Sequence, residues 1–147
     1  MGQQQILLVI LITIVIGITT IVALNVLNQR TQQSNRDAVR QDLAAAASYV
    51  QALWERPNLM GGANRRFTNL QEEIILQYLN IPATDYTPGD NEAKNDNGTY
   101  SVVIVDDAEL IIIGVPDSGP PNISIRIFRD DNTGRWLMSY LDNDEDD

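Results

Sequence analysis

The sequence feature that most constrains the fold is an uncharged, apolar run near the N-terminus, from Ile6 to Leu27. As a helix rising ~1.5 Å per residue, a run of this length crosses roughly the ~30 Å hydrocarbon core of a bilayer. Many of its residues are β-branched and form helices weakly in water, but in lipid every backbone group must bond within the segment. We therefore expect residues 6–27 to form a helix that spans a membrane or lies in the apolar core of a filament.

Small and weakly polar residues lie within this run. Gly17, together with Thr13, Thr19 and Thr20, would allow a second helix to approach closely, as small residues do between membrane helices. The alternative is a lone helix that faces lipid on all sides. If the helices pack, we expect the contacts to be made by Ile6, Val9, Ile10, Thr13, Ile14, Gly17, Ile21 and Leu24.

A cleaved secretory signal peptide is the competing interpretation of the run. Such peptides carry a basic N-terminal region, a shorter apolar stretch and a small-residue cleavage site. Residues 1–5 contain no Lys or Arg, and no Ala-x-Ala site stands directly after Leu27, so a retained anchor is favoured. The orientation stays open, because Arg30, Arg36 and Arg40 follow the run and the positive-inside rule would place that side in the cytoplasm.

Residues 28–56 are expected to continue the helix with a single apolar face. Apolar side chains recur there at three- and four-residue steps, the alanine-rich stretch favours helix, and Pro57 ends the pattern at about Glu55. The polar stretch Asn28–Asn35 could instead separate two helices. The apolar stripe comprises Val39, Leu43, Ala46 or Ala47, Val50, and Leu53 or Trp54.

The remainder of the chain is predicted to form a connecting region and an antiparallel sheet, so the fold class is α+β. Residues 57–98 are interpreted as a loop with one short helix, which Thr68 or Asn69 caps and which reaches about Leu79, followed by a long polar loop. About four strands are expected within 99–141, because β-branched and aromatic runs alternate with turn signals there. One face of this sheet would cover the stripe of the helix. Residues 142–147 are an acidic tail.

Composition excludes several classes of function. The net charge is -10, with 20 acidic and 10 basic residues, and most acids lie beyond Pro57. Nucleic-acid binding needs a basic footprint, so it is not expected. The chain contains no Cys and no His, which removes thiolate chemistry, Ser-His-Asp catalysis and the commonest transition-metal ligands. We expect no enzyme activity, no cofactor and no small-molecule substrate.

Three patterns could carry a site. The loop from Asp130 to Gly134 is rich in oxygen ligands but lacks EF-hand spacing, so it is interpreted as an acidic turn rather than a metal site. The adjacent carboxylates Asp106-Asp107 and Glu72-Glu73 are interpreted as solvated surface. Asn97 and Asn122 begin triplets that fit the N-glycosylation pattern and are candidate glycosylation sites.

The layout resembles that of type IV pilins and pseudopilins. The resemblance rests on the short polar N-terminus of residues 1–5, the apolar helix 6–27, its amphipathic continuation and the C-terminal sheet. It implies cleavage of a leader after Gly2, with Gln3 as the first mature residue, and methylation. The glutamate that the family places five residues into the mature chain has no counterpart, because Leu7 stands there after cleavage and Gln5 without it.

The resemblance implies a structural subunit of an extracellular, type IV pilus-like filament. Such a subunit polymerises with copies of itself through its N-terminal helix, waits in the inner membrane before assembly and ends on the cell surface. The alternative is a single-pass, membrane-anchored subunit of a secretion or envelope complex, which would bind its partner through the sheet edge or the acidic surface.

Overall fold

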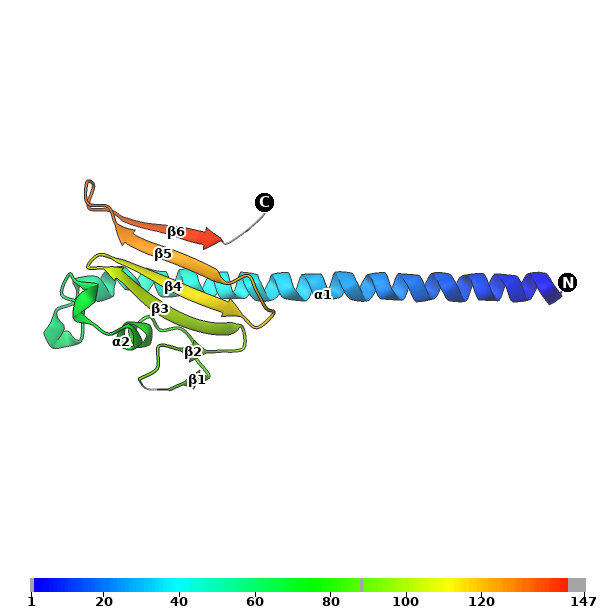
Figure 1. The fold of residues 1–147 in the computed structure, drawn as a ribbon, viewed down its shortest axis with the longest axis horizontal. Coiled ribbons are helices and arrows are strands. Elements are labelled where there is room, and N and C mark those ends of the chain that lie inside the picture. Colours follow the sequence, from blue (N-terminus) through cyan, green and yellow to red (C-terminus); the bar gives the residue numbers. More distant parts are fainter. Residues whose placement is uncertain (1, 88, 143–147) are drawn as a thin grey trace. The chain divides into compact units, whose positions relative to one another are not determined.

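The computed structural model describes residues 2–87 and 89–142. The chain divides into two compact units, one up to Ser34 (unit 1) and one from Asn35 onward (unit 2), and helix α1, Gly2–Glu55, contributes to both (Figure 1). The helix is unbroken through Asn28–Asn35, so the alternative of two separate helices is wrong. No Gly or Pro lies between Gly17 and Pro57, and the backbone hydrogen bonds of the helix therefore continue without interruption.

Short helical elements follow α1, which ends just before Pro57 as expected. They are the 3-10 turns η1, Asn58–Met60, and η2, Phe67–Asn69, and the helix α2, Glu72–Tyr78. The predicted N-cap of this helix at Thr68 or Asn69 is wrong. The helix begins later, after Gln71, which makes no side-chain cap. Thr68 and Asn69 bond elsewhere: the Thr68 hydroxyl donates to Asp107 Oδ1, and the Asn69 amide donates to Ala63 O.

A six-stranded antiparallel sheet forms the rest of unit 2, with the strands in sequence order (Figure 1). The four strands expected within 99–141 are β3, Gly98–Asp106, β4, Glu109–Pro116, β5, Ile123–Arg129, and β6, Trp136–Asp142. Two more strands, β1, Asp85–Tyr86, and β2, Ala93–Lys94, lie where a loop was predicted. Each spans two residues, which is too short to show a period of two in the sequence.

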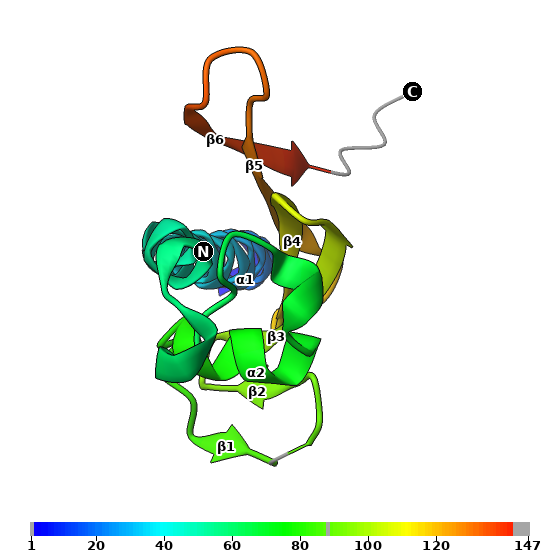
Figure 2. The ribbon, with the colours of Figure 1, turned by 90° about the vertical axis from the view of Figure 1, so that its left-hand side faces the viewer.

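The core of unit 2 lies between the sheet and the second half of α1, so the predicted α+β fold is confirmed. Figure 2 shows β4 beside the helix, with β1 and β6 at the outer ends of the sheet. The stripe expected to face the sheet is buried, and it comprises Val39, Leu43, Ala46, Ala47, Val50, Leu53 and Trp54. Inward residues of the strands meet it, including Tyr100, Val102, Leu110, Ile112, Ile125 and Ile127.

Gly114 on β4 lets α1 approach the sheet closely. A Cβ built at this position would lie 2.6 Å from Val39 Cγ1 and 3.4 Å from Leu43 Cδ1. Real carbon atoms do not approach within 2.6 Å, so only glycine fits here without a shift of the helix.

Candidate functional site

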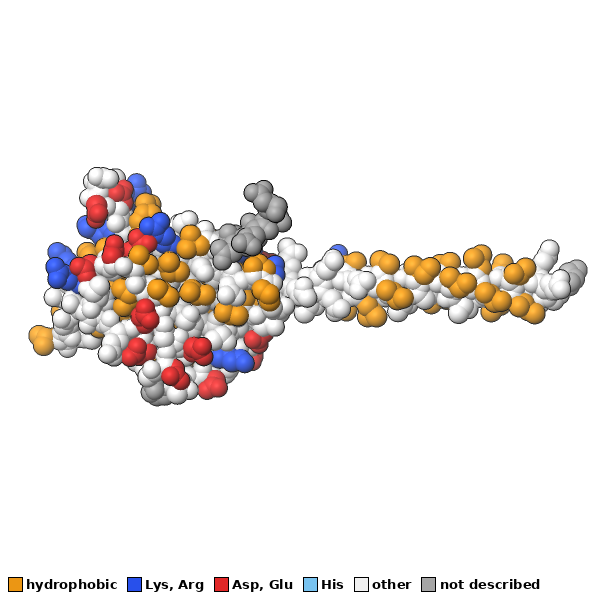
Figure 3. Space-filling view, in the orientation of Figure 1, with side chains coloured by type: hydrophobic (Ala, Val, Ile, Leu, Met, Phe, Trp, Pro, Cys, Tyr) orange, Lys and Arg blue, Asp and Glu red, His pale blue; other side chains and the backbone are white. Residues whose placement is uncertain are grey.

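Unit 1 is exposed, and its surface is apolar from Ile6 to Leu27. Every described residue from Gly2 to Ser34 is exposed, and the first buried side chain of α1 is Val39. Figure 3 shows apolar side chains along the visible face of this part of the helix. By length and composition α1 can cross a membrane. A contiguous apolar surface of this extent marks a membrane or protein contact, because a soluble monomer rarely exposes one.

The predicted contact residues of unit 1 share one face of the helix. Successive residues of an α-helix turn by 100°, and positions three, four and seven apart therefore align. The face comprises Ile6, Val9, Ile10, Thr13, Ile14, Gly17, Ile21 and Leu24. Thr20 joins this face near Gly17, whereas Thr19 lies on the opposite side.

Gly17 has no role in the fold of its own unit. A Cβ at this position would meet nothing within 4 Å. Glycine within a helix is less favourable than alanine by about 0.5–1 kcal/mol, because it loses more backbone entropy on folding. The open space around Gly17 leaves room for the close approach of a second helix, which is the contact that its sequence context predicts.

The threonine hydroxyls of the apolar run are satisfied inside the helix. Thr13, Thr19 and Thr20 each donate to the carbonyl four residues earlier, on Val9, Val15 and Ile16, at 2.8 Å. These three polar side chains therefore bring no unpaired donor into a lipid or protein environment.

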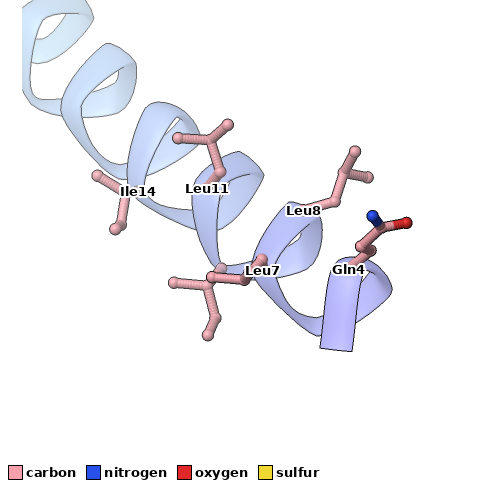
Figure 4. Close-up of a pocket in the computed structure, with 6 residues that line it drawn as sticks. Gln4, Leu7, Leu8, Leu11 and Ile14 are labelled. Atoms are coloured by element: carbon pink, nitrogen blue, oxygen red, sulfur yellow. The ribbon is translucent and has the colours of Figure 1, made fainter. Parts of the chain in front are cut away.

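Shallow apolar grooves lie along the first turns of α1. One is lined by Gln4, Leu7, Leu8, Ile10, Leu11 and Ile14, and Figure 4 shows these side chains spreading outward from the helix. A second is lined by Gly2, Gln5, Ile6, Val9 and Ile10. The predicted cleavage positions Gly2 and Gln3 lie in the first turn, and both are exposed. The first charged side chain in the sequence is Arg30.

A polar cluster centred on Asp42 joins α1 to the sheet. Asp42 Oδ2 accepts hydrogen bonds from Asn95 Nδ2 at 3.0 Å, Asn97 Nδ2 at 2.9 Å and the Tyr100 hydroxyl at 2.6 Å. Burial raises the pKa of Asp42, but these three bonds together hold it below its ordinary value of 3.8. Burial, reinforced by the Asp42 carboxylate, raises the pKa of Tyr100. Sequence reasoning missed this cluster, because Asp42 lies 53 to 58 positions before the three donors.

Asp42, Asn95 and Asn97 line a groove of about 330 Å³, which Pro82, Ala83, Thr84 and Asp96 complete. The bonds from Asn95 Nδ2 and Asn97 Nδ2 to Asp42 Oδ2 fix the turn at Asn95–Asn97 against the helix. We therefore interpret the cluster as structural.

The two candidate glycosylation sites differ in their surroundings. Asn97 is half-buried, and its amide nitrogen donates to Asp42, so it is occupied in the folded chain. The side chain of Asn122 is exposed. Access to a modifying enzyme therefore favours Asn122 over Asn97.

The acidic patterns of unit 2 use their carboxylates within the fold. Asp130 accepts from the Asn132 backbone at 2.9 Å and from the Thr133 hydroxyl at 2.8 Å, and these bonds lower its pKa. Glu72 accepts from Ile104 N at 3.0 Å, and Asp107 accepts from Thr68. Within residues 2–87 and 89–142, no group of three or more Asp or Glu side chains is arranged to hold a metal ion.

Exposed apolar side chains also lie on the outward face of the sheet, among polar and charged ones (Figure 3). Because directly paired residues share a face, Val103 and Val115 lie on the same side as the β6 residues Leu137 and Leu141. On the other side of β6, Met138 is exposed. Strand β6 is also the last in the sheet, so one of its backbone edges has no neighbouring strand in the described part of the chain.

The architecture combines a long apolar N-terminal helix with a C-terminal antiparallel sheet, which is consistent with a pilin-like fold. The helix face that contains Gly17 follows from the helical repeat alone and stays a predicted contact, whereas the Asp42 cluster needs the folded chain. Comparison with protein-family models, with curated proteins and with solved structures finds no match.

Proposed function

We propose that this chain is a structural subunit of an extracellular, type IV pilus-like filament. Copies polymerise through the helix face that contains Gly17, and the same segment anchors each copy in the inner membrane before assembly. The observation that carries the proposal is the surface of unit 1, which is apolar from Ile6 to Leu27 and exposed at every described residue.

Packing between helices is the interaction that favours assembly. Lipid tails are as apolar as leucine, so the hydrophobic effect does not drive the transfer of a helix from lipid to a helical core. Whether the helix stays in lipid or enters a helical core therefore depends on close packing at small residues. Gly17, with Thr13 and Thr20, provides a position where two helices can pack closely. The Thr13 and Thr20 hydroxyls already donate within the helix, so they bring no unpaired donor to this contact.

The charge of the chain supports a structural role over nucleic-acid binding. Of the 20 acidic residues, three lie up to Arg56 and the remaining 17 lie beyond it, with only six basic residues. An acidic surface keeps subunits soluble and suppresses non-specific association outside the membrane. The partners are other copies of the chain, with no nucleic acid and no small-molecule substrate.

The proposal is tested on material sheared from the surface of cells that express the chain. We expect electron micrographs to show filaments and mass spectrometry to identify this chain as their main component. Its absence from every filament fraction would contradict the proposal. Sequencing the N-terminus of the same material separates processing at Gly2, which leaves Gln3 first, from an unprocessed chain.

A second candidate is a single-pass anchored subunit of a secretion or envelope complex. The observation that favours it is the position of Arg30, Arg36 and Arg40 after the apolar run, because positive charges prefer the cytoplasmic side. Protease treatment of intact cells distinguishes the two functions. Digestion of unit 2 supports the filament, whereas full protection of unit 2 supports the anchored subunit.

A further inference from the structure

Two large apolar side chains protrude from the segment that follows α1. In residues 57–66, which we name the tip, Leu59 has a relative exposure of 101% and Met60 of 71%. The segment lies at the end of unit 2 where α1 stops (Figure 1). An apolar residue exposed this fully gains nothing from its own fold, so the tip is a candidate contact surface.

Backbone hydrogen bonds hold the tip in this position. The η1 turn is closed by Met60 N to Pro57 O at 2.9 Å and Gly61 N to Asn58 O at 2.9 Å. The return of the chain is tied to the last carbonyls of α1, from Ala63 N to Leu53 O at 3.0 Å, Asn64 N to Arg56 O at 2.9 Å and Arg65 N to Trp54 O at 2.7 Å. The tip therefore presents Leu59 and Met60 in a fixed geometry.

Two residues of the tip adopt a backbone conformation that non-glycine residues disfavour. Asn64 has φ 48° and Arg65 has φ 64°, both in the left-handed region. Strained residues persist where the surrounding structure enforces them, and they concentrate at functional sites. This strain is a second observation that points to the tip.

The tip is basic in a strongly acidic chain. Arg56, Arg65 and Arg66 lie in or beside it, and the sequence contains no acid from Arg56 to Gln71. Arg66 pairs with Asp107 at 3.5 Å and Arg56 lies over the Tyr78 ring, whereas the exposed Arg65 side chain extends from the strained turn. An acidic partner surface would complement the tip.

The opposite end of unit 2 offers such a surface. Asn35 marks this end, because its side chain bonds to Asn97 O at 2.8 Å and to Ser118 N at 3.0 Å. Two of its cations have partners, since Arg36 donates to Pro120 O and Arg40 pairs with Asp37, and the third, Lys94, is exposed on β2. Exposed acids at this end are Asp96 and Asp117, and exposed apolar residues are Val115 and Leu141.

The two ends are related along the helix axis. Asn35 and Glu55 are separated by roughly 30 Å at ~1.5 Å per residue. Copies that pack with parallel helices and an offset of this size bring the tip of one copy to the Asn35 end of the next. This contact joins two different surfaces, so it repeats without closing, as a filament requires.

We infer that the tip of each copy docks onto the Asn35 end of a second copy of this chain. Leu59 and Met60 cover Val115 and Leu141, and Arg65 faces Asp117. The inference rests on the proposed filament. It adds a directional, head-to-tail contact between the sheet units to the contact between the apolar helices.

Because the chain contains no cysteine, the contact can be tested by pairs of introduced thiols. In filaments of the full chain that carries Leu59→Cys and Asp117→Cys, mild oxidation should give a ladder of covalent oligomers. Parallel pairs join Leu59→Cys to Val115→Cys or Leu141→Cys. A bond within one copy is excluded, since a disulfide needs the two Cα atoms within about 7 Å.

The matched control pairs Leu59→Cys with Asp131→Cys. Asp131 is exposed in the turn before β6, at the same end of unit 2 as the tip, because Trp136 contacts Trp54 and Phe67. This pair should give no ladder. Arg65→Glu should weaken the ladder of the Asp117→Cys pair at low salt, and Arg65→Lys should preserve it.

The outcomes are distinguishable. Filaments without a ladder from any of the three pairs overturn the inference and leave the filament intact. Dimers from Leu59→Cys alone indicate a tip-to-tip contact and also overturn it. If the unmodified chain forms no filament, the proposed function fails first and the head-to-tail contact fails with it.

Discussion

Asp42 is the residue on which the junction between α1 and the sheet depends. Its carboxylate receives three side-chain donors from a segment that is distant in sequence, and two of these donors flank the turn before β3. A charged acceptor of three hydrogen bonds is stronger than a neutral one, and removing it leaves the donors unpaired.

Replacement of Asp42 by Asn should lower stability and flatten its dependence on acid. The pKa of Asp42 is lower in the folded chain than its ordinary value of 3.8, so the unfolded chain binds more protons in this range. The stabilisation is complete above that value and is lost as the pH falls through the folded pKa. We expect a loss of about 1–3 kcal/mol at pH 7, measured by thermal unfolding in detergent followed by circular dichroism.

The matched control for Asp42→Asn is Asp131→Asn, which removes a charge from an exposed turn. Its melting temperature should follow that of the parent chain from neutral to acidic pH. If the melting temperature of Asp42→Asn shows the same dependence on pH as that of the parent chain, the Asp42 carboxylate does not contribute to the acid dependence of stability.

Gly114→Val should destabilise unit 2 by overpacking. The new side chain would enter the space of Val39 and Leu43, and such insertions cost about 1–3 kcal/mol. Ser101→Val is the control, because Ser101 pairs with Ile113 on the outward face of the sheet. Denaturant unfolding of the two variants compares the inward and outward faces of the sheet. An equal unfolding midpoint for Gly114→Val and the parent chain would contradict the close contact between Gly114 and α1.

At the scale of elements, side chains protect the open edge of β3. Strand β2 pairs only with Thr99 and Tyr100. Farther along β3, the side chain of Asn91 makes the hydrogen bonds that a neighbouring strand would make. Its Nδ2 donates to Val102 O at 2.5 Å, and its Oδ1 accepts from Val102 N at 3.0 Å. Glu72 then accepts from Ile104 N at 3.0 Å. Exposed strand edges template aggregation, so these two side chains protect the sheet.

Removal of this protection should expose the edge of β3. We expect Asn91→Ala and Glu72→Ala each to cost about 1–3 kcal/mol, because backbone groups of β3 lose their partners. Both should also accelerate aggregation, followed by light scattering and thioflavin fluorescence. Glu73→Ala is the neighbouring control, and aggregation of all three variants at one rate would contradict the protective role.

Periodicity made the main elements predictable. The stripe from Val39 to Trp54 and the alternation of Ile123, Ile125 and Ile127 are local patterns, and both predictions are confirmed. Strands β1 and β2 were missed because they exist only through pairing with β3. The cap at Thr68 or Asn69 was predicted wrongly, because both side chains bond to distant groups.

The candidate sites follow the same division. The residues that share a helix face with Gly17 follow from the helical repeat, and the role of this face as a contact stays a prediction. The exposure of Leu59 and Met60 in the tip could not be predicted, because the path of the following chain decides whether such a pair in a loop is buried or exposed. The bonds from Ala63 and Arg65 to the end of α1 decide that it is exposed.

At the scale of the whole molecule, unit 1 carries an apolar surface from Ile6 to Leu27, and every described residue of the unit is exposed. Under the proposed function this surface lies in lipid before assembly and packs against other copies afterwards, with Gly17 at the closest approach of two helices.

Gly17→Leu should therefore block assembly and leave membrane insertion intact. Leucine separates the helices at their closest approach but is fully compatible with lipid. Thr19→Leu places the same side chain on the opposite side and should assemble at near the parent level. We expect at least a tenfold loss of filaments for Gly17→Leu in sheared fractions, with unchanged chain in membranes. Equal filament yields from the two variants would show that this face is not the contact.

Electron cryo-microscopy of the purified filaments tests the central claim most directly. The account predicts a core of closely packed helices whose density fits residues 6–27 of this chain, with Gly17 at a helix–helix contact and the sheet units outside. A filament core built from another protein, with this chain found only as a separate membrane-anchored subunit, would contradict it.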